Sequence, residues 1–239
     1  MVKTKIVVII PALNPLNALI GYVKNMLKFD IEKVIIINDG SDEKYQVVFD
    51  ELRKLDGCIV LTHQKNKGKG RALKTGFQYV ITYIKHVNFV ITVGAHGQHK
   101  LDDVQRILQN AAIFSDGIIL GVRSFNSKDM PLTSSIGNRT ASILFSLLFH
   151  KRLLDTQTGL RCIPKQQLYW CIKVPGESFS YDTNMLVEAI KRNIPIYEIP
   201  IGRLKLKKNS IMFYDEIINT HKLLQQMLIT YSKNRKHHN

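Results

Sequence analysis

The chain has 239 residues, of which 45% are hydrophobic and 22% are charged, a balance that is typical of a folded globular protein and excludes a wholly disordered chain. Lysine and arginine outnumber aspartate and glutamate by 34 to 19, so the net charge of +15 predicts attraction to phosphate groups on nucleotides, nucleic acids or anionic lipids. The three cysteines, Cys58, Cys162 and Cys171, form no CxxC pair; this argues against a disulfide framework or a zinc site and favours a reducing, cytoplasmic setting.

Short β-branched runs in the first half of the chain predict strands. These runs are "KIVVII" from Lys5, "KVIIIND" from Lys33, "CIVLTH" from Cys58, "NFVITV" from Asn88 and "GIILGV" from Gly117. Because the runs are apolar on nearly every residue and are separated by stretches of helical length, they indicate a mostly parallel sheet with helices on both faces. The first run meets Pro11 and Asn14 too soon for a signal peptide, so we expect a strand there.

The second half is less regular. We expect a helix from about Leu132 to His150, a loop over residues 154–164, a helix near 181–192, a strand at 196–201 and a last helix from about Phe213 to Tyr231. The sequence predicts a single α/β domain over residues 1–232, with a first half (1–122), a second half (123–232) and a basic tail (233–239). No window approaches the roughly 20 apolar residues that cross a bilayer.

Polar, Gly-rich or Asn/Asp-rich segments follow the predicted strands. They are "PALNP" (11–15), "NDGSD" (38–42), "HQKNKGKG" (63–70) and "GAHGQH" (94–99). In a parallel sheet, ligands bind beyond the carboxyl ends of the strands. These segments therefore predict a binding crevice at one edge of the sheet.

Seven segments, in order, carry a family resemblance: "VVIIPALN", "VIIINDGSD", "NKGKGRALKTGF", "GQH", "GNRTASILFSLLF", "DTQTGLR" and "IYEIPI" followed by "KKNS". With them the chain resembles the family 2 glycosyltransferases, and within these the polyprenyl-phosphate sugar synthases. The resemblance implies a Rossmann-like GT-A fold, in which residues 1–122 are the nucleotide-sugar-binding half and residues 123–232 the acceptor-binding half. It also implies inverting transfer of a sugar from a UDP- or GDP-sugar to undecaprenyl or dolichyl phosphate, at the cytoplasmic membrane face, for cell-surface glycan synthesis.

The resemblance also implies a nucleotide site. Asp39 would contact the base, although a turn or cap aspartate is the alternative, and Lys69 or Arg71 would meet the diphosphate at a helix start. The alternative for the two cations is a solvated basic helix start, and the spacing is not that of a Walker P-loop. The implied nucleotide-sugar-binding residues are Pro11, Ala12, Leu13, Asn14, Asp39, Gly40, Ser41, Lys69, Arg71, Gly94, Ala95, His96 and Gln98.

The family pattern is broken before "GQH", where relatives carry two aspartates that hold a divalent cation against the diphosphate. Here the triplet is Gly94-Ala95-His96, so the hard oxygen ligands that Mg²⁺ prefers are missing. His96 with Gln98 is a candidate Mn²⁺ site, because imidazole suits transition metals. Alternatively, His96 replaces the metal in a metal-independent enzyme, or the site is inactive. Pro15 stands where relatives have glutamate, and this joint loss of acids favours a site with little or no metal.

A lipid-phosphate acceptor needs no general base, because its oxygen is already anionic near neutral pH. Asp182 is either a base for a hydroxyl acceptor or a helix cap. By the resemblance, Asp155 lies near the sugar and the acceptor. The candidates for binding the acceptor phosphate are Arg123, Arg139 and Arg161, since a guanidinium fork suits phosphate.

The helix at 132–150 ends in an apolar segment next to His150, Lys151 and Arg152, a pattern that suits a bilayer interface or, equally, a buried helix. We therefore expect peripheral attachment to an anionic membrane surface on the inner face of the cell membrane, with a small membrane protein as a further partner. Two alternatives stay open: a glycosyltransferase acting on a saccharide hydroxyl, and an inactive nucleotide-binding subunit. No nucleic-acid-binding motif is present, so nucleic acid is not an expected partner.

Overall fold

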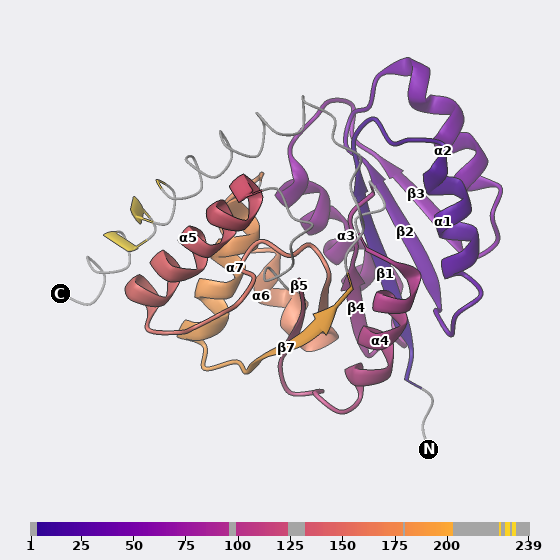
Figure 1. The fold of residues 1–239 in the computed structure, drawn as a ribbon. Coiled ribbons are helices and arrows are strands. Elements are labelled where there is room, and N and C mark those ends of the chain that lie inside the picture. Colours follow the sequence, from indigo (N-terminus) through magenta and orange to yellow (C-terminus); the bar gives the residue numbers. More distant parts are fainter. Residues whose placement is uncertain are drawn as a thin grey trace.

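The computed structural model describes residues 4–95, 99–123, 132–178 and 180–202, together with 225, 228, 229, 231 and 232; the side chains of 132–138 lie outside this description. Seven strands of the described chain form one sheet in the order β3-β2-β1-β4-β6-β5-β7 (Figure 1). The strands are β1 Ile6–Ala12, β2 Lys33–Asn38, β3 Cys58–Thr62, β4 Phe89–Thr92, β5 Ile118–Arg123, β6 Arg161–Pro164 and β7 Ile196–Ile201. All the pairings are parallel except those of β6 with β4 and β5, so the expected mostly parallel α/β sheet is confirmed.

Helices cover both faces of the sheet (Figure 1). On one face lie α1 (Ala18–Met26), α2 (Gln46–Arg53) and α4 (Leu101–Ala111). On the other face lie α3 (Lys69–Tyr83), α5 (Leu132–Phe149), α6 (Leu168–Cys171) and α7 (Ser180–Lys191). Two short 3₁₀ turns, η1 (Glu43–Tyr45) and η2 (Lys165–Gln167), complete the described helical elements.

The central strands are apolar throughout because both of their faces are buried. In β1, Val7 and Ile9 pack into the core under α3, whereas Val8 and Ile10 pack into the core under α1 and α4, and all four are 0% exposed. Successive side chains of a strand point to opposite faces, so one apolar run supplies two cores. The continuous runs in the sequence are therefore the signature of a sheet covered on both sides.

The prediction of a loop over residues 154–164 is wrong for its second half. Residues 161–164 form β6, which lies antiparallel between β4 and β5, with Ile91 opposite Cys162 and Ile119 opposite the same residue. Unlike β4, which is equally short but wholly apolar up to Thr92, β6 begins with Arg161 and ends with Pro164, so the sequence shows no β-branched apolar run there. It is fixed instead by partners that lie more than 40 residues away in the chain.

The C-terminal part of the chain is described only in places. The expected last helix lies largely outside the described residues, although 225, 228, 229 and 231 are helical and the ring of Tyr231 lies 6.2 Å from that of Phe149 on α5. Within the described ranges, no helix combines the length and the apolar character needed to cross a membrane. The division into halves at residue 122 stays a prediction, and the tail 233–239 lies outside the described residues.

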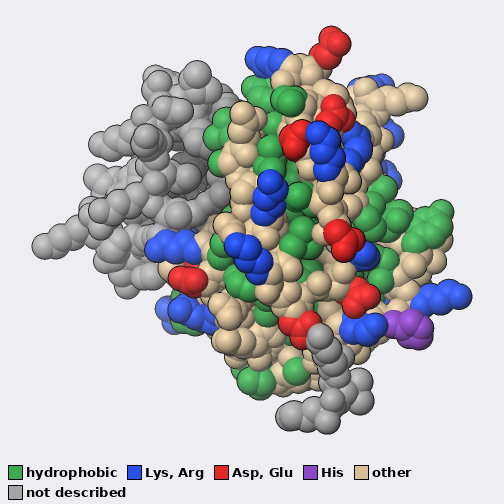
Figure 2. All heavy atoms as spheres, turned by 90° about the vertical axis from the view of Figure 1, so that its right-hand side faces the viewer, with side chains coloured by type: hydrophobic (Ala, Val, Ile, Leu, Met, Phe, Trp, Pro, Cys, Tyr) green, Lys and Arg blue, Asp and Glu red, His purple; other side chains and the backbone are tan. Residues whose placement is uncertain are grey.

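Basic and acidic side chains are interspersed on the face shown in Figure 2. On α2, for example, Arg53 pairs with Asp50 at 2.7 Å and Lys54 with Glu51 at 2.6 Å, and all four side chains are exposed. Exposed pairs of this kind contribute little to stability. On this face, therefore, the excess positive charge does not form a continuous basic surface.

Candidate functional site

The loops after β1 and β2 are tied together at the carboxyl edge of the sheet. The backbone N–H of Asn14 donates to Ser41 Oγ at 2.9 Å, and its side-chain amide exchanges two hydrogen bonds with Asp42. Asn14 has a φ of +50°, and Asn accepts this left-handed conformation more readily than most residues. Of the predicted neighbours, Ala12 is buried and Leu13 is exposed, so this segment lies at the carboxyl edge of the sheet, where the sequence predicts the binding crevice.

Asp39 holds the loop that precedes α3. Its side chain is buried, and its carboxylate accepts the N–H groups of Lys67 at 3.0 Å and Gly68 at 2.8 Å, and pairs with His63 Nδ1 at 2.6 Å. Asp39 Oδ2 accepts one bond from the described residues, which leaves acceptor capacity for the N–H of a base. Gly40 has a φ of +72°, a conformation that favours glycine. A Cβ at this position would lie 2.2 Å from the backbone carbon of Lys65, so the loop before α3 can pack against residue 40 only because it is a glycine.

The two predicted diphosphate cations have different partners. Arg71 is exposed and forms a two-pronged ion pair with the Glu177 carboxylate, which also accepts a hydrogen bond from Lys74 at 3.0 Å. Lys69 begins α3, and its ammonium pairs with Asp182. The side chain of Lys69 is 24% exposed. The partly exposed Lys69 therefore joins α3 to α7, while Arg71 fastens α3 to the segment before α7.

Arg161 is a structural residue. It is 1% exposed, and its guanidinium donates to the backbone carbonyls of Thr158 at 3.0 Å, Asp182 at 2.7 Å and Thr156 at 3.2 Å. It also lies 3.7 Å from the Asp182 carboxylate. The expectation that Arg161 binds an acceptor phosphate does not fit this placement, because its donors are directed into the protein.

Arg123 and Asp155 form the second ion pair of the site. Arg123 ends β5, and its Nε and Nη2 donate to the Asp155 carboxylate at 2.7 and 3.1 Å. Asp155 is 0% exposed, whereas the Arg123 side chain is 36% exposed. Next to Asp155, the N–H of Leu154 donates to Glu198 at 2.7 Å, which fixes the loop to β7. Arg139 is exposed on α5, and none of the described contacts joins it to this pair.

His99 lies between these two ion pairs. It is 3% exposed, and neither of its ring nitrogens has a hydrogen-bond partner among the described residues. Burial, followed by the charges of Arg123 and Lys69, lowers the pKa of His99 to about 4, while Asp155 acts in the opposite direction. The imidazole is therefore neutral near pH 7. A Cβ on Gly159 would lie 3.7 Å from His99 Nε2 and 3.5 Å from Lys69 Nζ, so the three residues meet.

The residues described at the end of β4 do not fit a divalent cation. Gly94 and Ala95 supply no side-chain ligand, and the described chain contains no group of three or more His, Cys, Asp or Glu side chains that could hold a metal. The carboxylates of Asp155 and Asp182 are both bound to cationic side chains. His96 and Gln98 lie outside the described residues, so their roles as catalytic residue or ligands stay predictions.

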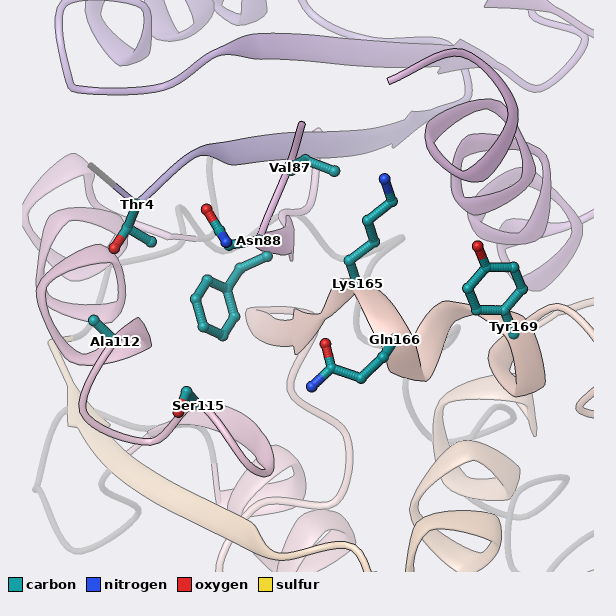
Figure 3. Close-up of a pocket in the computed structure, with 9 residues that line it drawn as sticks. Thr4, Val87, Asn88, Ala112, Ser115, Lys165, Gln166 and Tyr169 are labelled. Atoms are coloured by element: carbon teal, nitrogen blue, oxygen red, sulfur yellow. The ribbon is translucent and has the colours of Figure 1, made fainter. Parts of the chain in front are cut away.

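A separate cavity of about 660 Å³ lies at the opposite edge of the sheet (Figure 3). It is lined by residues that precede β1 and β4, such as Thr4 and Asn88, and by Lys165 and Gln166 of η2. The Lys165 ammonium is already bound to the backbone carbonyls of residues 84 and 85. This cavity belongs to the amino ends of the parallel strands, so it is not part of the crevice.

The sequence profile described as Glycosyl transferase family 2 matches residues 7–169 of the chain. The chain belongs to glycosyl transferase family 2. The UDP-N-acetylglucosamine–dolichyl-phosphate N-acetylglucosaminyltransferase of Methanococcus voltae is 30% identical to it over 222 residues, which are 84% of this chain and 86% of that protein. The dolichyl-phosphate β-glucosyltransferase of Saccharomyces cerevisiae is 21% identical over 229 residues, 82% of this chain and 65% of that protein.

A solved structure shows the same fold. Glucosyl-3-phosphoglycerate synthase from Mycobacterium tuberculosis, in complex with Mn²⁺, uridine diphosphate and phosphoglyceric acid, is similar with a TM-score of 0.70 at 13% identity, over 95% of this chain and 78% of that one. The expected GT-A fold is therefore confirmed. The family match includes Asp39, Lys69, Arg123 and Asp155, whereas Asp182 and Glu177 lie beyond it.

The sequence did not suggest a role for three residues of the candidate site, His99, His63 and Glu177. His99 stands in the recognised "GQH", within the polar segment that follows β4, and that position was the available signal. His63 follows β3 in the same way. Glu177 had no signal, because its partner Arg71 lies 106 residues away in the chain.

Proposed function

We propose that the protein transfers a sugar from a UDP- or GDP-sugar to the phosphate of a polyprenyl lipid. The observation that carries the proposal is the arrangement of side chains at the carboxyl edge of the sheet, where two partly exposed cations, Lys69 and Arg123, lie near the buried ring of His99. Family membership supports sugar transfer, and the names of the dolichyl-phosphate relatives support a lipid-phosphate acceptor.

The reaction requires charge stabilisation more than proton transfer. An oxygen of the lipid phosphate attacks the anomeric carbon, the bond from that carbon to the diphosphate oxygen breaks, and the bonding electrons leave with the nucleoside diphosphate. The attack comes from the face opposite the leaving group, so the configuration is inverted. Because the attacking oxygen is already anionic, the chain needs no general base.

Lys69 and Arg123 are proposed to stabilise different charges in this reaction. Lys69, at the start of α3, is proposed to face the departing diphosphate, where the positive end of the helix adds to its charge. Arg123, at the end of β5, is proposed to bind the lipid phosphate with its planar donors. Both side chains are held in place by buried carboxylates, so neither needs to be ordered when the substrates arrive.

The donor, the acceptor and the metal requirement are tested in one assay. Purified protein is mixed with undecaprenyl or dolichyl phosphate and a panel of UDP- and GDP-sugars, with EDTA, Mg²⁺ or Mn²⁺ present, and lipid-linked sugar is measured. We expect product in EDTA, because Gly94 and His96 stand where relatives have the metal-binding aspartates. Product with Mn²⁺ alone that is lost in His96→Ala would instead make His96 a metal ligand. No product under any condition would contradict the proposal.

An apolar surface on α5 and on the loop that carries Asp155 supports the proposed peripheral contact with a membrane surface. Ile143 and Leu147 lie one turn apart on α5 and are 61% and 68% exposed, and Leu154 is 53% exposed. Ser142 donates to the backbone carbonyl of Leu154 at 3.2 Å, which joins α5 to the loop that carries Asp155. Lys151 is exposed in the same connection, where it can reach anionic headgroups.

The double variant Ile143→Ser/Leu147→Ser is expected to bind vesicles that contain phosphatidylglycerol about tenfold or more weakly than the wild type, because two apolar side chains no longer enter the interface. Flotation of the protein with the vesicles measures this. Ile113→Ser removes an equally exposed side chain after α4, on the other face of the sheet, and should have no effect. Equal losses in both variants would contradict a specific α5 surface.

A further inference from the structure

Two buried carboxylates hold the two proposed substrate cations in place. Asp155 pairs with Arg123 at 2.7 Å, and Asp182 pairs with Lys69. Asp155 lies in the turn of residues 155–158 that precedes β6, whereas Asp182 lies in the first turn of α7. The distance between the two cations therefore depends on the contacts that join this turn to α7.

The side chain of Gln157 joins the turn directly to α7. Its amide Nε2 donates to the hydroxyl of Thr183, the residue after Asp182, at 3.1 Å and to the hydroxyl of Thr156 at 3.2 Å. Its backbone N–H donates to the Asp155 carboxylate at 3.1 Å. A side-chain amide has two N–H donors, so both are used in these contacts. One residue thus contacts the first carboxylate and the helical turn that carries the second.

The turn is also fixed to β5 and to α7 by buried contacts. Thr158 is 1% exposed, and its hydroxyl donates to the Gly121 carbonyl of β5 at 2.6 Å. Arg161 donates to the Asp182 carbonyl at 2.7 Å and to a carbonyl of the turn at 3.2 Å. Because Arg161 is buried and charged, its replacement would disturb the fold. Gln157 is uncharged and partly exposed, so its contact with α7 can be broken without leaving a buried charge unpaired.

We propose that Gln157 is a positioning residue, which fixes the separation of Lys69 and Arg123 by joining the two carboxylates that hold them. The inference rests on the proposed function, in which Lys69 faces the departing diphosphate and Arg123 the attacking phosphate. Each substrate can bind with one of the two cations. Transfer requires both cations at once, because the leaving and attacking oxygens lie on opposite sides of the same carbon. An error in their separation should therefore slow the transfer step and leave both affinities intact.

Gln157→Leu removes the amide and keeps a side chain of similar size. Single-turnover transfer, with the nucleotide sugar and the lipid phosphate varied in turn, gives the maximal rate and the half-saturating concentration of each substrate. We expect the maximal rate to fall about tenfold to a hundredfold, since a misplacement of about 1 Å can have an effect of this size. The half-saturating concentrations should stay unchanged. Calorimetry with free UDP or GDP counts the folded molecules, so that partial unfolding does not imitate a slower rate.

Thr183, which accepts the hydrogen bond from Gln157, provides an independent test. Thr183→Val keeps the shape of this buried side chain and removes its hydroxyl, so it should lower the maximal rate as Gln157→Leu does. Thr183→Ser keeps the hydroxyl and should retain most of the rate. The double variant Gln157→Leu/Thr183→Val should be no slower than the slower single variant, because both changes break the same bond.

Gln78→Leu is the matched control for the loss of the amide. Gln78 is exposed on α3, and its Nε2 donates to the hydroxyl of Thr82 at 3.1 Å. This bond joins two residues of the same helix and does not connect two elements. The variant should therefore change neither the maximal rate nor the half-saturating concentrations.

The outcomes separate this inference from the proposed function. Higher half-saturating concentrations at an unchanged maximal rate would overturn it, because Gln157 would then contact a substrate itself. An unchanged rate in Gln157→Leu, a rate in Thr183→Ser as low as in Thr183→Val, or losses that multiply in the double variant would also overturn it, and the transferase proposal would stand. If the wild type transfers no sugar to a lipid phosphate, both proposals fail together.

Discussion

Asp182→Asn is expected to lower the free energy of unfolding by about 3 kcal/mol. The Asp182 carboxylate is 6% exposed and faces two cations, the Lys69 ammonium in direct contact and the Arg161 guanidinium at 3.7 Å. The Arg161 side chain is 1% exposed, so the loss of the carboxylate leaves a buried positive charge without its counterion. Chemical denaturation of variant and wild type measures the change.

An exposed aspartate provides the control for this substitution. Asp50→Asn removes a similar ion pair, that with Arg53 at 2.7 Å, but the Asp50 side chain is 55% exposed. Its cost is expected to stay below about 1 kcal/mol, because solvent screens the pair. If Asp182→Asn cost no more than Asp50→Asn, the buried cluster would not be stabilising the fold.

The sequence left two roles open for Asp182, a general base for a hydroxyl acceptor and a helix cap. Lys69→Met separates the roles, because it leaves Asp182 paired with Arg161 and should cost little stability. We expect Lys69→Met to lower transfer strongly, and Lys69→Met/Asp182→Asn to lower it no further once unfolding is accounted for. An additional loss in the double variant would favour Asp182 as the base.

The fold was predictable wherever the sequence carried an apolar run. The strands β1, β2, β4 and β5 each followed from a short run rich in β-branched residues, which is typical of a strand that is buried on both faces. β6 was missed because its four residues are placed by β4 and β5 on either side. Its antiparallel direction is a property of the assembled sheet and has no local signal.

The sequence placed candidate residues at the carboxyl edge of the sheet, where a parallel sheet binds its ligands, but it did not reveal their pairings. Asp39 was proposed from the family resemblance, and Arg123 from its guanidinium and its position after a strand; the substrate contacts of both stay predictions. The ion pair of Lys69 with Asp182 joins residues 113 positions apart, and the sequence gives no sign of it. Arg161 was assigned to the acceptor for its chemistry alone, while its burial depended on β6, which the sequence did not reveal.

Arg123→Lys is expected to lower kcat/KM for the lipid phosphate by about a hundredfold, mainly through a higher KM for the lipid. Lysine keeps a positive charge beside the buried Asp155, so the fold should persist, but it loses the planar donors that now reach Asp155 at 2.7 and 3.1 Å and that we propose also reach the acceptor. Hydrogen bonds to charged groups contribute about 1.5–3 kcal/mol, and the upper end of this range corresponds to about a hundredfold. Steady-state kinetics with the lipid varied at saturating donor measure the effect.

Two comparisons make this result specific to the acceptor. The affinity of Arg123→Lys for the free nucleotide should match that of the wild type, because Lys69, and not Arg123, is proposed to face the diphosphate. Arg192→Lys changes an arginine that pairs with Glu188 at 2.8 Å at the far end of α7, and should leave both kinetic constants unchanged. If Arg123→Lys instead weakened nucleotide binding with no change in the KM for the lipid, Arg123 would belong to the donor side, and the exposed Arg139 on α5 would become the acceptor candidate to test.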